Sequence, residues 1–203
     1  MSEPRLLPLV DAPPAERRDA ARNRERLLDA AKALVDEHGP RAVTMEAVAA
    51  AAGVGKGTVF RRYQSREGLM VAVLDHSEAE WQSAVMSGPP PLGPGADPWD
   101  RLLAFGRSRL ESTLLHVELI REAGRDAGRA GGAYAFTVTH VRHLLRQLGV
   151  GGDVAILATA LLAPLELPLD GRVPVEDFPF ERVYDGWVDL ARRIVGRGEV
   201  GDG

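Results

Sequence analysis

A short basic segment is the part of this 203-residue chain whose residue types could do chemistry. Between Glu46 and Glu67 there is no acidic residue, although the whole chain carries a net charge of −4. The cations of the segment are Lys56, Arg61, Arg62 and Arg66. Clustered cations bind nucleic acid because they displace counterions from phosphates, and affinity follows the local patch and not the total charge. The segment therefore predicts a phosphate-binding surface.

Within this region, residue type and position indicate different contacts. Gly55 and Gly57 would open a helix, where a bare backbone approaches DNA closely and exposed N–H groups favour a phosphate. Lys56 and Arg62 could donate to guanine edges in the major groove, and the role of Arg61 is left open. Phosphate contacts fix the position on DNA without reading sequence, and four side chains suit them: Thr44, Thr58, Tyr63 and Arg66. The alternative, a solvated basic helix in a hairpin, does not explain the glycines.

Helices before and within this region must position it. From about Asp19, apolar residues recur on one face at helical spacing, and Gly39-Pro40 ends the pattern. Thr44 can N-cap a second helix, and Gly53 after it can take a left-handed turn without a Cβ clash. A third helix, which carries the basic residues, follows the turn. Two short helices around a tight turn predict a helix-turn-helix able to enter a DNA groove.

The segment from Arg22 to about Trp81 resembles the DNA-binding region of the TetR family of bacterial transcriptional regulators. The resemblance rests on ordered motifs: RERLLDAA at 24–31, HG at 38–39, TM at 44–45, AAGVGKGTVF at 51–60 and YQSREGL at 63–69. It covers under a third of the chain and implies a three-helix reader whose 58–63 region lies in the major groove. A fourth helix from Ser65 would link the reader to a helical ligand-binding and dimerisation domain.

The same resemblance implies a set of DNA contacts: Thr44, Lys56, Gly57, Phe60, Arg62 and Arg66. Phe60 departs from the commonest pattern, which has Tyr, so a phosphate-bonding hydroxyl would be missing there. Tyr63 could partly compensate for it. Three further cations lie just ahead of the first helix, where they could touch a phosphate or the minor groove or merely keep an arm solvated: Arg17, Arg18 and Arg22.

Proline and glycine divide the rest of the chain. Residues 1–18 hold four prolines and no helical period, so we expect a disordered arm there. At 88–98, eight of eleven residues are Gly or Pro, which predicts a linker loop. We expect the DNA-binding domain at 19–66 and the helical ligand-binding and dimerisation domain at 67–198. Helical stripes without a convincing strand predict an all-α fold with about nine helices.

The C-terminal half offers candidates for a ligand pocket. Helices predicted over 99–117 and 134–148 combine apolar walls with a few polar anchors. The candidates are Trp99, Phe105, Arg109, Thr113, Glu118, Arg121, Tyr134, Phe136 and His140, although each could be ordinary core or surface. Arg121 and Arg125 could hold an anion, or could pair with the neighbouring glutamates. The resemblance implies a small-molecule effector and does not name it.

Two helices of this half also predict self-association. The helix over 154–165 is apolar on nearly every side, and the last helix has an aromatic face, so both need burial partners. Two such helices from each of two chains would form a four-helix interface. Its predicted residues are Leu157, Leu161, Leu162, Leu165, Tyr184, Trp187, Ala191 and Ile194. The alternative is that both helices pack only within their own chain.

The composition argues against several classes of site. Without cysteine there is no disulfide, thiol catalysis, cysteine zinc site or iron–sulfur cluster. His140 and His143 lack a suitably spaced carboxylate or cysteine, so we expect no metal site. No P-loop, dinucleotide fingerprint or nucleophile elbow is present, so we expect neither a cofactor nor an enzyme. The apolar run at 6–10 is interrupted by Pro8 and no run approaches a membrane span, so we expect a cytoplasmic protein without a membrane partner.

Together these patterns predict a sequence-specific DNA-binding transcriptional regulator. We expect a ligand-responsive repressor that binds a palindromic DNA operator as a homodimer. Two alternatives stay open. One is a helical small-molecule-binding module that has lost specific DNA binding, against which the intact basic cluster argues. The other is an all-α enzyme acting on a phosphorylated substrate, against which the absence of a catalytic constellation argues.

Overall fold

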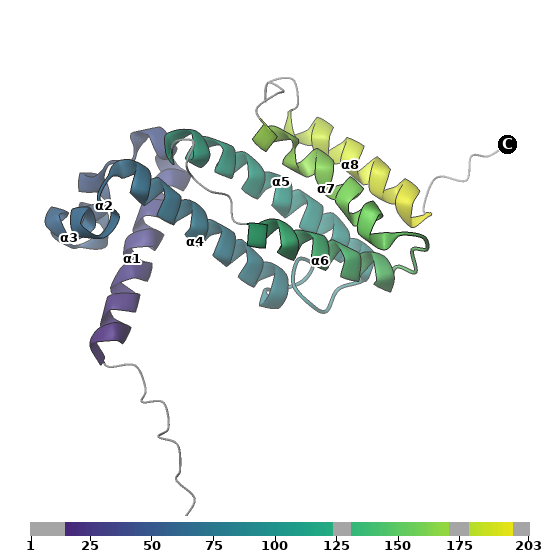
Figure 1. Ribbon diagram of the computed structural model, residues 1–203, viewed down its shortest axis with the longest axis horizontal. Coiled ribbons are helices and arrows are strands. Elements are labelled where there is room, and N and C mark those ends of the chain that lie inside the picture. The colour runs from purple at the N-terminus through teal and green to yellow at the C-terminus, as the bar shows by residue number, and fades with distance from the viewer. Residues whose placement is uncertain (1–14, 124–130, 171–178, 197–203) are drawn as a thin grey trace, which may run out of the picture. The chain divides into compact units, whose positions relative to one another are not determined.

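The computed structural model describes residues 15–123, 131–170 and 179–196, which form only helices and the turns between them (Figure 1). The helices are α1 (Ala15–His38), η1 (Pro40–Ala42, a short 3-10 helix), α2 (Met45–Ala52), α3 (Lys56–Tyr63), α4 (Arg66–Ser87), α5 (Pro98–Ala123), α6 (Gly131–Gln147), α7 (Val154–Asp170) and α8 (Phe180–Val195). The all-α prediction is therefore confirmed. The described residues hold eight α-helices where about nine were predicted.

The chain divides into two compact units, Met1–Arg66 and Glu67–Gly203. In the N-terminal unit, α1 begins at Ala15, earlier than the expected Asp19, and ends before Gly39, whose φ is 75°. Most of the predicted arm lies outside the described residues. Among the described residues, no helix is long and apolar enough to cross a bilayer.

Local signals in the sequence place α2 and α3. The Thr44 Oγ1 accepts a hydrogen bond from the Ala47 N–H at 3.1 Å and so caps α2, as predicted. Gly53 ends α2 with φ 67° and ψ 33°, a left-handed conformation that costs a residue without a Cβ little. The small core beneath is closed by apolar side chains from all three helices: Leu27, Leu28, Ala31, Val35, Val48, Ala49 and Val59. This packing leaves the opposite side of α3 exposed.

In the C-terminal unit, α5 packs against α6, α7 and α8, and α7 also packs against α6 and α8. Asp97 precedes α5 and Asp153 precedes α7, and the Oδ1 atom of each accepts a backbone hydrogen bond from the first turn of its helix. Trp187 of α8 is buried and donates its indole N–H to the Leu161 carbonyl at 2.8 Å. Gly106 of α5 makes this close packing possible, because a Cβ there would lie 2.2 Å from the Trp187 ring.

The burial of α7 and α8 corrects part of the predicted dimer interface. Five of its residues are buried within a single chain: Leu161, Leu162, Leu165, Trp187 and Ala191. They belong to the core that α5 and α6 share with α7 and α8, so they offer no surface to a second chain. Leu157, Tyr184 and Ile194 are only partly buried against the same core. The outward face of α7 instead carries Ile156, which is 65% exposed.

Candidate functional site

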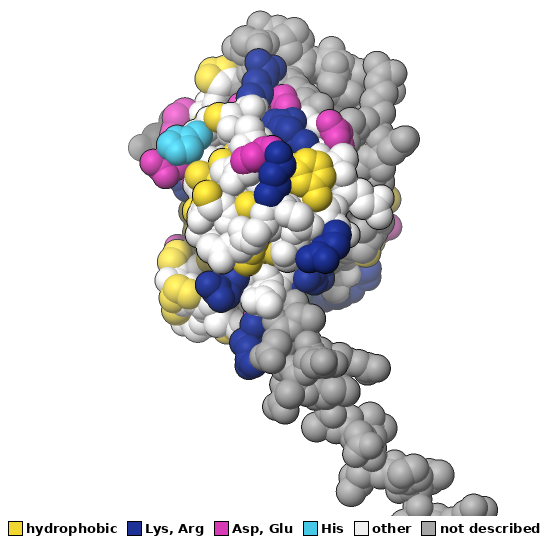
Figure 2. All heavy atoms as spheres, turned by 90° about the vertical axis from the view of Figure 1, so that its left-hand side faces the viewer, with side chains coloured by type: hydrophobic (Ala, Val, Ile, Leu, Met, Phe, Trp, Pro, Cys, Tyr) yellow, Lys and Arg dark blue, Asp and Glu magenta, His cyan; other side chains and the backbone are white. Residues whose placement is uncertain are grey.

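The exposed side of α3 brings most of the predicted DNA-contacting residues together. Val59 is buried toward the core, whereas the residues around it are exposed: Gly55, Lys56, Gly57, Thr58, Phe60, Arg61 and Arg62. Figure 2 looks onto this side of the N-terminal unit and shows dark blue basic side chains spread among white, yellow and several magenta acidic ones. An exposed helix face with cations and bare glycine backbone suits entry into a nucleic-acid groove.

Three of the predicted DNA-contacting residues also take part in the structure of the N-terminal unit itself. The Thr44 hydroxyl caps α2. The Arg66 guanidinium donates to the Val43 carbonyl at 2.9 Å and to the Pro40 carbonyl at 2.6 Å, so it ties the first turn of α4 to the loop before α2. Tyr63 is buried, and burial raises the pKa of its phenol while the nearby Arg62 and Arg24 lower it. The expectation that Tyr63 replaces an exposed hydroxyl at Phe60 is therefore wrong, because its own hydroxyl faces the interior.

Lys56 has two neighbours on the protein itself. Its ammonium forms an ion pair with the Glu46 carboxylate and lies 5.5 Å from the centre of the Phe60 ring. The hydrogen bond from Lys56 is the main cause that lowers the pKa of Glu46. In the sequence Glu46 marked only the edge of the acid-free segment, so its place beside Lys56 was not predicted. The spacing of ten residues across the Gly53 turn carries no periodic signal that would have revealed the pair.

A second cluster of functional side chains lies inside the C-terminal unit, around Arg109. Its side chain is only 4% exposed and pairs with Glu78 of α4 at 2.9 Å and with Glu166 of α7 at 2.8 Å. The guanidinium also lies 4.9 Å from the centre of the Trp81 ring. A buried cation is stable only when it is paired and hydrogen-bonded. The two carboxylates accept its hydrogen bonds here, and the Trp81 ring adds a cation–π contact. The sequence indicated Arg109 as a pocket residue but did not indicate its three partners, Glu78, Trp81 and Glu166.

Aromatic rings extend the Arg109 cluster. Trp81 lies 5.4 Å from Phe105 and 5.9 Å from Phe136, measured between ring centres, and Phe105 stacks on His140 at 5.1 Å. Burial lowers the pKa of His140 to about 4, with smaller effects from Arg101 and His143, so the ring is neutral at pH 7. Four of the predicted pocket residues, Phe105, Arg109, Phe136 and His140, therefore meet in one place.

Of the other predicted pocket residues, some are buried in the C-terminal unit and some are exposed on its surface. Thr113 is fully buried on α5, whereas Tyr134 is 46% exposed and Glu118 is also exposed, so these two lie outside the interior cluster. Trp99 packs at the edge of the core, and the Arg121 side chain lies outside the described residues. Among the described residues, five buried polar side-chain atoms in this unit make no hydrogen bond: Ser77 Oγ, Arg101 Nε, Thr113 Oγ1, His140 Nε2 and Arg142 Nε. Such atoms are costly unless a further molecule satisfies them.

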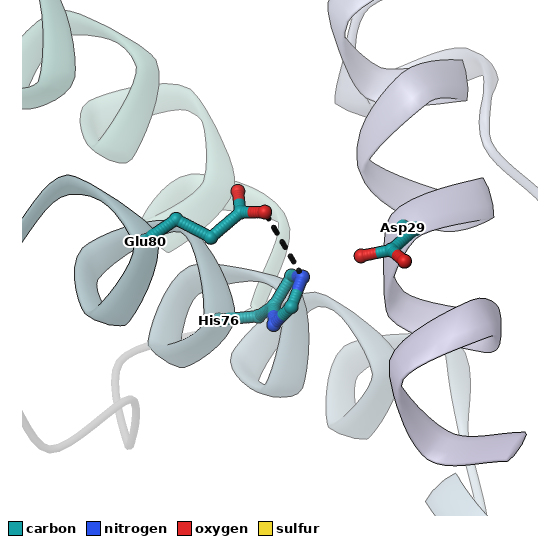
Figure 3. Close-up of side chains that lie close together, drawn as sticks. All are labelled: Asp29, His76 and Glu80. Carbon is teal, nitrogen blue, oxygen red and sulfur yellow. Dashed lines mark ion pairs between the residues drawn. The ribbon is translucent and has the colours of Figure 1, made fainter. Parts of the chain in front are cut away.

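His76 and Glu80 form a separate pair on the surface of α4. The His76 Nε2 and Glu80 Oε1 atoms are 3.6 Å apart, and the dashed line in Figure 3 marks this ion pair. The two residues are one helical turn apart, which is the ordinary spacing for such a pair. The pair therefore has a local explanation on its own helix.

Comparisons with known proteins agree with this arrangement. Residues 27–73 match the family model for bacterial regulatory proteins, tetR family. No curated protein matches the chain. A structure described as that of a TetR-family transcriptional regulator from Rhodococcus sp. is 21% identical, with a TM-score of 0.56, over 86% of this chain and 99% of that one.

Two similar structures are of SmeT, the repressor of the Stenotrophomonas maltophilia multidrug efflux pump SmeDEF. One is 19% identical with a TM-score of 0.52, over 84% of this chain and 88% of SmeT. The other, a SmeT–triclosan complex, is 20% identical with a TM-score of 0.50, over 85% and 90%. These likenesses show a common fold. Residues 27–73 thus match the N-terminal region of the TetR family, and the chain shares its fold with structures described as TetR-family transcriptional regulators.

Proposed function

We propose that this regulator binds an operator duplex as a homodimer and that a small molecule changes its affinity for that duplex. The observation that carries the proposal is the exposed face of α3, where cations and glycine backbone surround a buried Val59. Lys56 and Arg62 are the proposed base readers, and Arg61 and Thr58 are proposed phosphate contacts. Thr44 and Arg66 keep their structural bonds in this proposal, and the Thr44 hydroxyl, which only accepts in its cap, can donate to a phosphate.

Fluorescence anisotropy with a duplex from the region upstream of the protein's own gene tests DNA binding. We expect sequence-specific binding at moderate salt, and its absence would contradict the proposal. Arg62→Ala should weaken operator binding by about 1–3 kcal/mol and relax the preference at one base pair if Arg62 reads a base. A uniform loss on every duplex would instead mean that Arg62 contacts phosphate.

Self-association in this proposal uses the outward faces of α7 and α8. Ile156 is a large apolar side chain that the described part of the chain leaves 65% exposed. A dimer would present two α3 helices to major grooves about 34 Å apart, as a palindromic operator requires. Light scattering after gel filtration should give the mass of two chains. Ile156→Glu should lower that mass, whereas Met86→Glu, at another exposed apolar residue, should leave it unchanged.

Effector sensing in this proposal uses the interior cluster around Arg109. Support comes from the aromatic rings and from the unsatisfied Thr113 and His140 atoms, which a small molecule with hydrogen-bonding groups could satisfy. SmeT, a neighbour in fold, is known in complex with triclosan. We therefore propose a small aromatic effector. It would shift DNA affinity only if it binds the two conformations of the protein unequally.

Quenching of tryptophan fluorescence by a panel of small aromatic compounds tests the effector site, since Trp81 lies in the cluster. Phe136→Ala should weaken binding of any compound that quenches. An equal affinity in that variant would place the compound elsewhere. The absence of specific DNA binding together with effector binding would favour a helical sensor module that does not read DNA.

A further inference from the structure

The ion pair between Glu46 and Lys56 lies on the surface that the proposed function directs at DNA. Glu46 is in the first turn of α2, and Lys56 is the first residue of α3. Their side chains are 56% and 57% exposed, so neither is held by burial. The carboxylate and the Phe60 ring both draw the ammonium toward the protein. Lys56 is thus already partnered before any nucleic acid arrives.

The ion pair between Glu46 and Lys56 lowers the number of cations that this surface can offer to phosphates. Glu46 is the only acidic residue of residues 45–66, and Arg66 is already bonded to two backbone carbonyls. The exposed cations of α3 are therefore Lys56, Arg61 and Arg62, and Glu46 neutralises one of these three. Non-specific affinity for DNA depends on the number of phosphates that cations neutralise. A neutralised Lys56 adds little to that number.

Specific binding depends on Lys56 in a different way. A guanine edge offers the ammonium two acceptors in fixed positions, which can replace the carboxylate as its partner. A random phosphate offers only charge, and the nearby Glu46 carboxylate repels it. Discrimination between two partners often rests on such a repulsive element against the wrong one.

We propose that Glu46 is a specificity-determining residue, which holds Lys56 and thereby lowers affinity for random duplex more than for the operator. This inference rests on the proposed function, because it concerns a surface that binds DNA. Glu46 contributes without being a DNA contact itself. The role of Glu46 is to position Lys56 and to keep the charge of the Lys56 ammonium away from phosphates.

Anisotropy titrations of the full chain with the upstream duplex and with a random duplex test the proposal. Glu46→Gln should tighten random-duplex binding by about two- to fivefold, the range of an exposed ion pair, and change operator binding less. It should also steepen the dependence of log K on log salt by about one unit per chain, as one more phosphate contact does. Glu37→Gln is the matched control, because it removes the same charge from an exposed residue of α1.

A double variant shows whether the effect passes through Lys56. In a Lys56→Ala background, Glu46→Gln should no longer tighten random-duplex binding. Tightening that persists there, or that Glu37→Gln reproduces, would overturn the proposal in favour of general charge repulsion. A selective loss of operator binding in Glu46→Gln would also overturn it, because Glu46 would then contact a base. If the wild-type protein binds neither duplex, the proposed function itself fails and the inference fails with it.

Discussion

The exposed side chains of α3 are of two chemical kinds, cations and one aromatic ring. Phe60 is 41% exposed, although an aromatic ring usually finds cover in a core. Its ring supports the Lys56 ammonium and can contact an apolar thymine methyl in a groove. At this scale the structure adds the contact with Lys56, which the sequence did not indicate; the resemblance implied only a DNA contact at Phe60 without a phosphate-bonding hydroxyl.

Phe60→Tyr should strengthen operator binding, because the added hydroxyl projects from an exposed ring and can donate to a phosphate. A single such hydrogen bond should tighten binding by about two- to tenfold. Anisotropy measures the change, and Phe60→Leu serves as the control without a hydroxyl. Equal affinities of the Tyr variant and the wild type would mean that the ring faces a base and not the backbone of DNA.

His140 should make the stability of the C-terminal unit dependent on pH. Its pKa is about 4 in the folded chain, against a usual 6.5, so the unfolded chain binds more protons between these values. The free energy of unfolding is therefore at its maximum above about pH 6.5, and it falls by up to about 3 kcal/mol as the pH drops toward 4. Urea unfolding at several pH values measures this. His140→Phe should weaken the dependence, and His143→Gln, at an exposed ring, should not.

At the scale of elements, helix ends follow local sequence signals closely. Thr44 caps α2 and Gly53 takes the left-handed turn as predicted, because a cap or such a turn depends only on neighbouring residues. Partners across helices could not be predicted in the same way. Glu166 is the only charged residue between Asp153 and Asp170, which marks it as unusual, yet nothing local indicates that it pairs with Arg109.

The burial of five predicted interface residues within their own chain has the same physical reason. An apolar helix must be buried, but periodicity does not say which surface covers it. The residues Leu161 and Leu165 of α7 are covered by other helices of the same chain. The ring cluster was partly predicted, because Phe105 and Arg109 lie one turn apart on one helix, while Trp81 comes from another.

Gly106→Ala should destabilise the packing of α5 against α8. The new methyl group would lie 2.2 Å from the Trp187 ring, so the helices must separate or the ring must rotate. Overpacking of this kind costs about 1–3 kcal/mol, more than the helix propensity gained. Urea unfolding followed by circular dichroism measures it. Gly186→Ala is the matched control, since open space surrounds that glycine of α8, and it should be neutral or slightly stabilising.

At the scale of the whole molecule, a chain with a net negative charge carries a basic surface on α3. The net charge of −4 repels DNA in general, while the exposed cations of α3 attract it locally. Three exposed cations per chain would give six in a dimer. This arrangement favours binding by one face in one orientation over coating of the duplex.

The salt dependence of operator binding should report this count. With Lys56 and Arg62 at bases, as proposed, only Arg61 of these three meets a phosphate in each chain, so log K should fall against log salt with a slope of about −2. All six cations at phosphates would give a slope of about −5. Titrations between low and moderate potassium chloride measure the slope. A slope near zero would mean that the cations of α3 do not meet phosphates, and a slope beyond about −9 would require further cations such as those in the N-terminal part of α1.

The Arg66 side chain links two segments that are far apart in the sequence. Arg66 is the first residue of α4, and its guanidinium is anchored to the carbonyls of Pro40 and Val43, immediately before the Thr44 cap. Loss of the Arg66 side chain should therefore loosen the segment that sets the start of α2. The guanidinium is a polar cross-link inside the N-terminal unit, which supplements its apolar core.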